Sequence, residues 1–139
     1  MRSPVTIQYR LVARDSSAPG AQRVPVRGST ASVAVEGDTI ITEADIADAR
    51  EETRRWWSIL SGSHRASDIR ITLRPDGARK LAQASAAHIG DQLVIVVNGE
   101  VVSQAIIRDP ISGNEFMISG GMTKEEARAL ARLAGSRKP

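Results

Sequence analysis

Histidine side chains are the groups in this chain that could most readily bind a metal ion or transfer a proton. His64 and His88 are far apart in the sequence, and neither has a second histidine or a cysteine at the spacing of a metal site. The chain contains no cysteine, which excludes a thiolate nucleophile, a disulfide framework and a zinc knuckle. We therefore predict that the protein binds no metal and no cofactor.

The acidic residues between Asp45 and Glu52 are the second group that could do chemistry, because two nearby carboxyls can act as general acid and base. Arg50 and Arg54 are interleaved with them, which is typical of a solvated surface, and no feature of the segment indicates burial. No serine lies in a G-x-S-x-G motif. The sequence predicts no catalytic residue, and we do not expect an enzyme.

One short stretch combines aromatic and basic side chains. Both tryptophans of the chain, Trp56 and Trp57, directly follow Arg54 and Arg55. On a strand the two indole rings would face opposite sides, so that one is buried and the other exposed. An exposed tryptophan beside arginines can stack on nucleic-acid bases or on peptide side chains. Simple packing within a sheet explains the pattern equally well, and both interpretations stay open.

Length, composition and charge limit the class of protein. The 139 residues are the usual size of one domain, and 41% hydrophobic with 25% charged residues is typical of a globular fold. The longest apolar run, Leu93–Val97, is too short to cross a bilayer, and the N-terminus lacks the apolar run of a signal peptide. The formal charge of +3 is spread without a basic tail, so nucleic-acid binding is not expected.

The first half of the chain is predicted to begin with a strand over Val5–Val12, where apolar and polar residues alternate. An extended stretch over Val24–Val35 follows, and Glu36-Gly37-Asp38 is expected to end it as a turn. Thr42 is expected to cap a helix that carries Ile46 and Ala49 on one face. The end of that helix is left open, and a strand over residues 54–60 is favoured after it.

The second half of the chain has clearer patterns. A strand over residues 69–73 is followed by a helix over Pro75–Ile89, with Ile89 on its apolar face and Gly90 as its stop. Asn98-Gly99 predicts a type I′ hairpin turn with positive φ at both residues. A short strand over residues 116–118 and a last helix, which starts at the capping box Thr123–Glu126 and stops at Gly135, complete the chain. The fold class predicted is α+β: a single domain with a largely antiparallel sheet and two or three helices packed on one face.

The segment Ser119-Gly120-Gly121 leads directly into the last helix. Its backbone amides could hold an anion at a helix start, but the segment lacks the lysine and the spacing of a P-loop. We expect instead that the glycines let the backbone turn sharply.

Several segments of this sequence, taken in order, resemble one family. They are Ile71–Lys80 (ITLRPDGARK), Ile89–Ser103 (IGDQLVIVVNGEVVS), Ile107–Gly113 (IRDPISG) and Ile118–Ala127 (ISGGMTKEEA), with weaker matches at Tyr9–Val12 and Ile41–Ala49. These segments resemble the head subdomain of the large first periplasmic domain of SecD and SecDF, the accessory proteins of the Sec translocon. The chain departs from the family pattern at Arg74, where the family usually has a helix-capping threonine.

The resemblance implies a non-enzymatic, extracytoplasmic domain that contacts unfolded or translocating polypeptide in protein export. The alternative is an assembly module that reuses the same fold to bind one fixed protein partner. The implied organisation is a single domain over residues 1–139, with an N-terminal strand and extended segment over 1–38 and a head-like core over 40–134. Membrane contact would come only through segments outside this sequence or through a partner, such as the translocon components.

Polypeptide binding by such a domain requires exposed apolar area beside a sheet edge or a movable loop. The sequence offers two places, the Trp56-Trp57 segment and the 113–122 loop, and arginines beside them would favour acidic or mixed peptides. The candidate polypeptide-binding residues are Trp56, Trp57, Phe116, Met117, Met122, Arg54, Arg55 and Arg108.

Overall fold

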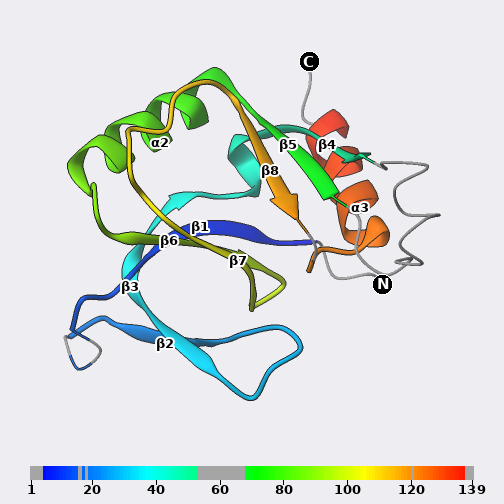
Figure 1. Cartoon of the computed structure of the whole chain (residues 1–139). Helices are drawn as coiled ribbons and strands as arrows, with labels where there is room; N and C mark the ends of the chain where they lie inside the picture. Colours follow the sequence, from blue (N-terminus) through cyan, green and yellow to red (C-terminus); the bar gives the residue numbers. More distant parts are fainter. Residues whose placement is uncertain (1–4, 16, 18, 53–67, 120, 137–139) are drawn as a thin grey trace, which may run out of the picture.

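The computed structural model describes residues 5–15, 17, 19–52, 68–119 and 121–136, which form strands and helices in the order drawn in Figure 1. Within these residues, the helical elements are a single 3-10 turn, η1 (Glu43–Asp45), and two α-helices, α2 (Pro75–Ala87) and α3 (Lys124–Ser136). The strands are β1 (Ile7–Val12), β2 (Gln22–Pro25), β3 (Ser32–Ile41), β4 (Ile46–Glu52), β5 (Asp68–Leu73), β6 (Gln92–Val97), β7 (Glu100–Ile106) and β8 (Glu115–Ser119).

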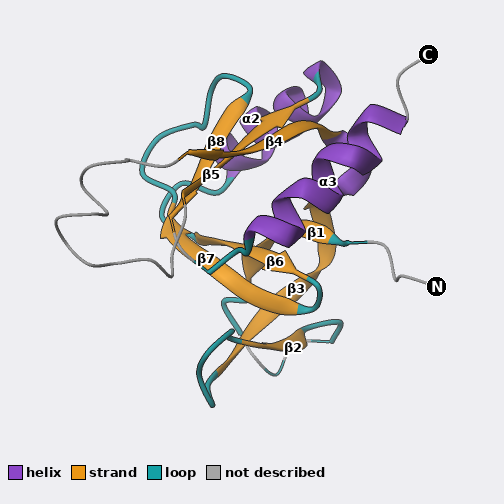
Figure 2. Cartoon of the chain, turned by 90° about the vertical axis from the view of Figure 1, so that its right-hand side faces the viewer, coloured by secondary structure: helices purple, strands orange, loops and turns teal. Residues whose placement is uncertain are grey.

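The strands form two antiparallel sheets. The larger sheet has the order β2-β3-β1-β6-β7, and it curls so strongly that its first and last strands meet (Figure 2). Val26, just after β2, forms a bridge with Val101 of β7, and the Arg27 N–H donates to the Val101 carbonyl at 3.0 Å. The smaller sheet has the order β4-β5-β8. The α+β class predicted from the sequence is therefore confirmed.

The main core, as we call it, fills the space between the two sheets. The two helices cover the sides of the main core: α3 packs along β4, and α2 packs against β3 and β5. Alternate residues of β5 face this core, as the sequence predicts for residues 69–73. Its largest fully buried side chains are Tyr9, Ile7, Ile41, Ile46, Ile69, Ile71, Leu73, Ile95, Ile118 and Leu130.

A second, smaller core lies on the opposite face of the curled sheet, and we call it the valine core. Strand β6 contributes to both cores, because Leu93, Ile95 and Val97 face the main core while Val94 and Val96 face the valine core. A strand that is buried on both faces has a continuous apolar sequence in place of an alternating one. The buried members of the valine core are Val24, Val35, Val94, Val96 and Val101.

The β6–β7 hairpin has the turn that its sequence predicts. Asn98 has φ of 51° and Gly99 has φ of 83°, so both residues have the positive values that a type I′ turn requires. The side-chain oxygen of Asn98 also accepts a hydrogen bond from the Thr6 N–H at 3.0 Å. The turn is thereby fixed to the start of β1.

The prediction of a helix that starts at Thr42 is wrong. Thr42 does cap a helical turn, since its hydroxyl accepts from the Ala44 N–H, but only the three residues of η1 follow before β4 begins. Residues of β4, from Ile46 to Glu52, pair with β5, and this long-range ladder supplies the backbone hydrogen bonds that a helix would otherwise make. The capping pattern correctly indicated a helical turn at Thr42, and pairing with β5 determined that a strand follows this turn.

The prediction of a turn at Glu36-Gly37-Asp38 is also wrong, because β3 continues through these residues. Arg10 pairs with Thr39 while Val12 pairs with Val35, so residues 36–38 form a bulge in the ladder. The Arg10 guanidinium donates to the Glu36 carbonyl at 2.6 Å, and burial lowers the pKa of Arg10. Turn-forming residues here mark an irregularity within a strand.

Helix α2 begins at Pro75, as expected, but it ends at Ala87. Arg74 occupies the N-cap position and makes no side-chain capping hydrogen bond, consistent with the departure from the family pattern. Asp45 is held against the first turn, where Lys80 Nζ lies 2.8 Å from its Oδ2 and a Cβ on Gly77 would lie 2.8 Å from its Cβ. Only glycine therefore fits at position 77 without a shift.

Candidate functional site

The described candidate residues occupy different environments. Met122 is buried in the main core, whereas Arg108 is exposed in the segment after β7. Phe116 is half-buried, and Met117, on the opposite face of β8, is 41% exposed. The remaining candidates, Arg54, Arg55, Trp56 and Trp57, and the strand favoured over 54–60, lie outside the described residues.

Phe116 is attached to the main core through Tyr9. The two rings meet edge to face, with centroids 5.3 Å apart and an interplanar angle of 63°. Tyr9 is fully buried, its hydroxyl has no hydrogen-bond partner among the described residues, and burial raises the pKa of that hydroxyl. An aromatic pair of this geometry adds about 1 kcal/mol beyond the burial of area. Phe116 is therefore held in place at the border of the core.

Strand β8 forms an outer edge of the smaller sheet, and it pairs with β5 alone among the described strands. The other sheet edges are occupied: β2 and β7 meet each other through Val26 and Val101, and α3 packs along β4. The edge of β8 thus combines unpaired backbone groups with the exposed Met117.

Among the described residues, two further large apolar side chains are exposed, and sequence reasoning missed both. Ile89 was expected on the apolar face of a helix, but α2 ends at Ala87, and Ile89 is 46% exposed. Ile106, at the end of β7, is 53% exposed. The segments that carry them are neighbours, because the Gly90 N–H donates to the Ile107 carbonyl at 2.7 Å. The sequence signal that could have indicated this exposure is Gly90, which directly follows Ile89 and marks the end of the helix.

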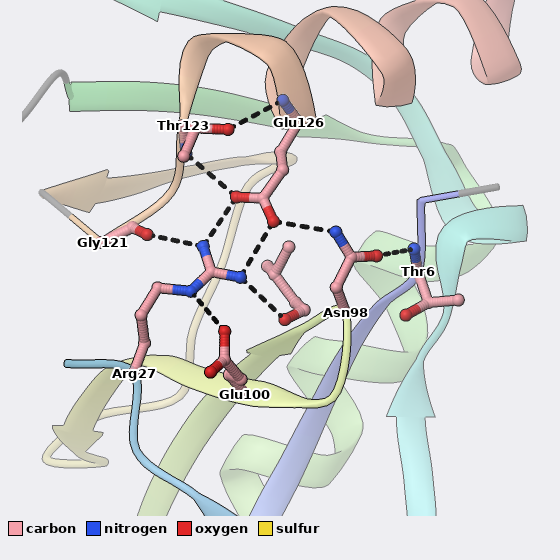
Figure 3. Close-up of polar contacts among 8 residues, drawn as sticks. Thr6, Arg27, Asn98, Glu100, Gly121, Thr123 and Glu126 are labelled. Carbon is pink, nitrogen blue, oxygen red and sulfur yellow. Dashed lines mark hydrogen bonds and ion pairs between the residues drawn. The ribbon is translucent and has the colours of Figure 1, made fainter. Parts of the chain in front are cut away.

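A polar cluster around Arg27 joins the curled sheet to the start of α3 (Figure 3). The Arg27 guanidinium forms a two-pronged ion pair with Glu126, with Nη1–Oε1 of 2.7 Å and Nη2–Oε2 of 2.9 Å. Its Nε donates to Glu100 at 2.9 Å, and further hydrogen bonds reach the carbonyls of Gly121 and Val97. All five N–H groups of the guanidinium are therefore used. We call this set of contacts the Arg27 latch.

Glu126 belongs both to the latch and to the cap of α3. Its Oε1 accepts from the Thr123 N–H while the Thr123 hydroxyl accepts from the Glu126 N–H, which confirms the predicted capping box. Asn98 Nδ2 donates to Oε2 at 2.8 Å. Burial raises the pKa of Glu126, but the hydrogen bonds from Arg27, Thr123 and Asn98 outweigh it, so the net pKa is lowered. The carboxylate is thus held in its charged form.

The turn between β8 and α3 is tied down by the same latch. Gly121 has φ of 82°, and a Cβ there would lie 2.8 Å from the Val102 carbonyl oxygen, so that only glycine fits. The predicted sharp turn is confirmed at Gly121. Sequence reasoning missed Arg27 because an arginine before a glycine in a polar loop is indistinguishable from a solvated one.

His88 and Asp91 form a separate polar group at the end of α2. His88 Nδ1 lies 3.0 Å from Asp91 Oδ2, and Arg14 Nε donates to Asp91 Oδ1 at 2.7 Å. The hydrogen bonds from Arg14 and then His88 lower the pKa of Asp91. Within the described part of the chain, no three side chains of histidine, cysteine, aspartate or glutamate gather as metal ligands would. The group ties the segment after β1 to the turn before β6.

A family model described as SecDF, P1 head subdomain, matches residues 21–136. A SecDF protein translocase subunit of Thermus thermophilus is 32% identical over 100 residues, which are 72% of this chain and 12% of that protein. A SecD protein translocase subunit of Acidaminococcus fermentans is 29% identical over 118 residues, 83% of this chain and 26% of that protein. The chain thus spans a minor part of the length of these relatives.

A solved structure of SecDF, a membrane component that enhances protein export, has the same fold. The TM-score is 0.66 at 22% identity, and the match covers 96% of this chain and 63% of that chain. A crystal structure of SecDF in a super-membrane-facing form gives a TM-score of 0.65 at 23% identity over 95% of this chain and 19% of that chain. Across the residues that the structure describes, no helix has the length and apolar character needed to cross a membrane.

Proposed function

This chain belongs to the SecDF P1 head subdomain family, and from that premise we propose that it acts outside the cytoplasm as a non-enzymatic contact surface for unfolded or translocating polypeptide. The relatives are protein translocase subunits, and this is what supports a polypeptide as the proposed ligand. The proposed protein partners are components of the Sec machinery.

The observation that carries the proposal is the outer edge of β8. Met117 is exposed there, and half-buried Phe116 faces the border of the main core in the same strand. A methionine side chain adapts its shape to different apolar partners, which suits a surface that receives many sequences. An unpaired strand edge offers main-chain hydrogen bonds that do not depend on the sequence of the ligand.

Charge adds a weaker contribution. Arg108 is exposed and has no ion-pair partner among the described residues. Arg54 and Arg55, with Trp56 and Trp57, stay candidates from the sequence alone. Exposed arginines favour acidic or mixed polypeptides, and the attraction weakens as salt screens it. We therefore expect apolar contacts to dominate at physiological ionic strength.

Binding to a reduced and carboxymethylated α-lactalbumin, a denatured polypeptide, tests the proposal together with thermal stability. Met117→Ala should lower affinity severalfold with the melting temperature nearly unchanged, because the side chain is exposed. The matched control is Ile89→Ala, an exposed apolar side chain at the end of α2. It should change neither quantity.

Three outcomes would count against the proposal. The first is that the wild-type chain binds no denatured polypeptide, and the second is that Met117→Ala binds as well as wild type. The third is that each loss of binding follows a proportional loss of stability. Any of these results favours an assembly module with one fixed folded partner. Such a module buries one large patch against a single protein.

A further inference from the structure

The backbone groups at the open edge of β8 can be assigned from the hydrogen-bond pattern. The Leu73 N–H donates to the Asn114 carbonyl at 2.6 Å, which makes residues 73 and 114 a hydrogen-bonded pair. Such pairs recur at every second position of an antiparallel ladder, and the register joins Ile71 to Phe116 and Ile69 to Ile118. The N–H and C=O groups of Phe116 and Ile118 therefore point to β5.

The groups left over are those of residues 115, 117 and 119. Their N–H and C=O groups point away from β5, toward the side of β8 on which no described strand pairs. They form a regular row, because the β5–β8 register runs from Thr72↔Glu115 to Asp68↔Ser119 without a bulge. A row of this kind is the template that an added strand needs.

The sequence of β8 lacks the usual protection of an edge strand. Natural edges are blocked by lysine, by proline, by a bulge or by a covering element. Residues 115–119 read EFMIS, with neither lysine nor proline, and the single charge, Glu115, stands at the first position of the strand. Phe116 and Ile118 are of residue types that favour strands. By contrast, β4 is covered by α3, and the β2 and β7 edges close on each other.

We infer that β8 binds an extended polypeptide segment by strand addition, so that the segment becomes a fourth strand of the smaller sheet. This inference rests on the proposed function and specifies how the polypeptide is held. Met117 supplies both a hydrogen-bonding N–H at the centre of the row and an exposed side chain beside the added strand. Main-chain pairing explains how one surface can accept unrelated sequences.

Alternate backbone methylation of a peptide ligand tests the inference on the unmodified chain. The probe is a capped nine-residue peptide of alternating valine and serine with a lysine at each end, compared with copies N-methylated at one amide. Strand addition predicts a period of two. Methylation of an amide that faces β8 weakens binding about fivefold, because one lost hydrogen bond costs about 1 kcal/mol, and methylation of the other amides has little effect.

The matched protein variants are Met117→Pro and Met117→Ala. Proline is tolerated where a strand N–H faces away from its sheet partner, so Met117→Pro removes one edge donor. It should weaken peptide binding more than Met117→Ala, which leaves the backbone intact. Circular dichroism and thermal melting show whether Met117→Pro folds; the methylated peptides decide the question if it does not.

The outcomes separate this inference from the proposed function. Binding of denatured polypeptide that is indifferent to the position of methylation leaves the proposed function standing and overturns strand addition. Absence of all binding overturns both. Concentration-dependent pairing of the chain with itself through β8, without peptide binding, shows that a second copy occupies the edge and also overturns the inference.

Discussion

The main core and the valine core lie on opposite faces of the curled sheet and share buried residues of β3 and β6, but they are closed in different ways. The main core contains large side chains such as Tyr9, Ile95 and Leu130, and two helices enclose it. The buried members of the valine core are all valine, and a bridge with the Arg27 latch closes the sheet around it. Burial stabilises both regions, and the valine core has in addition a polar contact where the sheet closes.

The largest effect is expected in the main core. Leu130→Ala should lower the free energy of unfolding by about 3 kcal/mol, because it removes a fully buried side chain and leaves a cavity. Urea unfolding followed by circular dichroism measures the change. A loss below about 1 kcal/mol would mean that α3 contributes little to the closure of this core.

Removal of the Arg27 latch tests whether a polar contact closes the valine core. Arg27→Ala should cost about 2 kcal/mol, because it leaves the Glu126 carboxylate without its main partner. The control is Arg50→Ala, which breaks an exposed ion pair with Asp48 and should cost less than about 0.5 kcal/mol. Equal losses in the two variants would contradict the difference between the two cores.

A pair of identical substitutions compares the cores directly. Val35 lies in the valine core and Val97 in the main core, and both are fully buried. Each change to alanine should cost about 1.5 kcal/mol from the two methyl groups removed. The pattern of amide hydrogen exchange should differ between the two variants. Val35→Ala should speed exchange first at the amides of β2 and the start of β3, while Val97→Ala should speed exchange in both sheets. The same exchange pattern in both variants would show that the cores unfold as one.

The latch should also make stability depend on acid. Because the pKa of Glu126 is lowered in the folded protein, its stabilisation is present above the usual value of 4.5 and is lost as the pH falls through the folded value. Glu126→Gln should be about 1 kcal/mol less stable than wild type at pH 7. The difference should shrink toward pH 3. Urea unfolding at both pH values measures it, and a constant difference would argue against a charged latch.

The smallest effect is expected outside both cores. Met117→Ala should change stability by less than about 0.5 kcal/mol, because the side chain is exposed on the outer face of the smaller sheet. Thermal melting provides the measurement. A larger loss would show that Met117 supports the fold, and the surface proposed for polypeptide would then have a structural role.

The sequence by itself determined the elements whose signals are local. Positive φ at Asn98 and Gly99 follows from their residue types, the capping box at Thr123 and Glu126 needs only one helical turn, and the alternation of Ile69 and Ile71 indicates a buried face. Those features formed as predicted because each depends on neighbours within a few residues. The α+β class followed from the order of the elements along the chain, and the SecDF head family followed from the resemblance of several segments to that family.

Tertiary structure decided which strands pair, which edges close and which stay open. Thr42 would cap a helical turn whether a long helix or a strand followed it. Pairing with β5 made residues 46–52 a strand. Arg27 and Glu126 lie far apart in the sequence, and only the curl of the larger sheet brings them together. No local pattern encodes such contacts, because their energy appears only when distant segments are already in place.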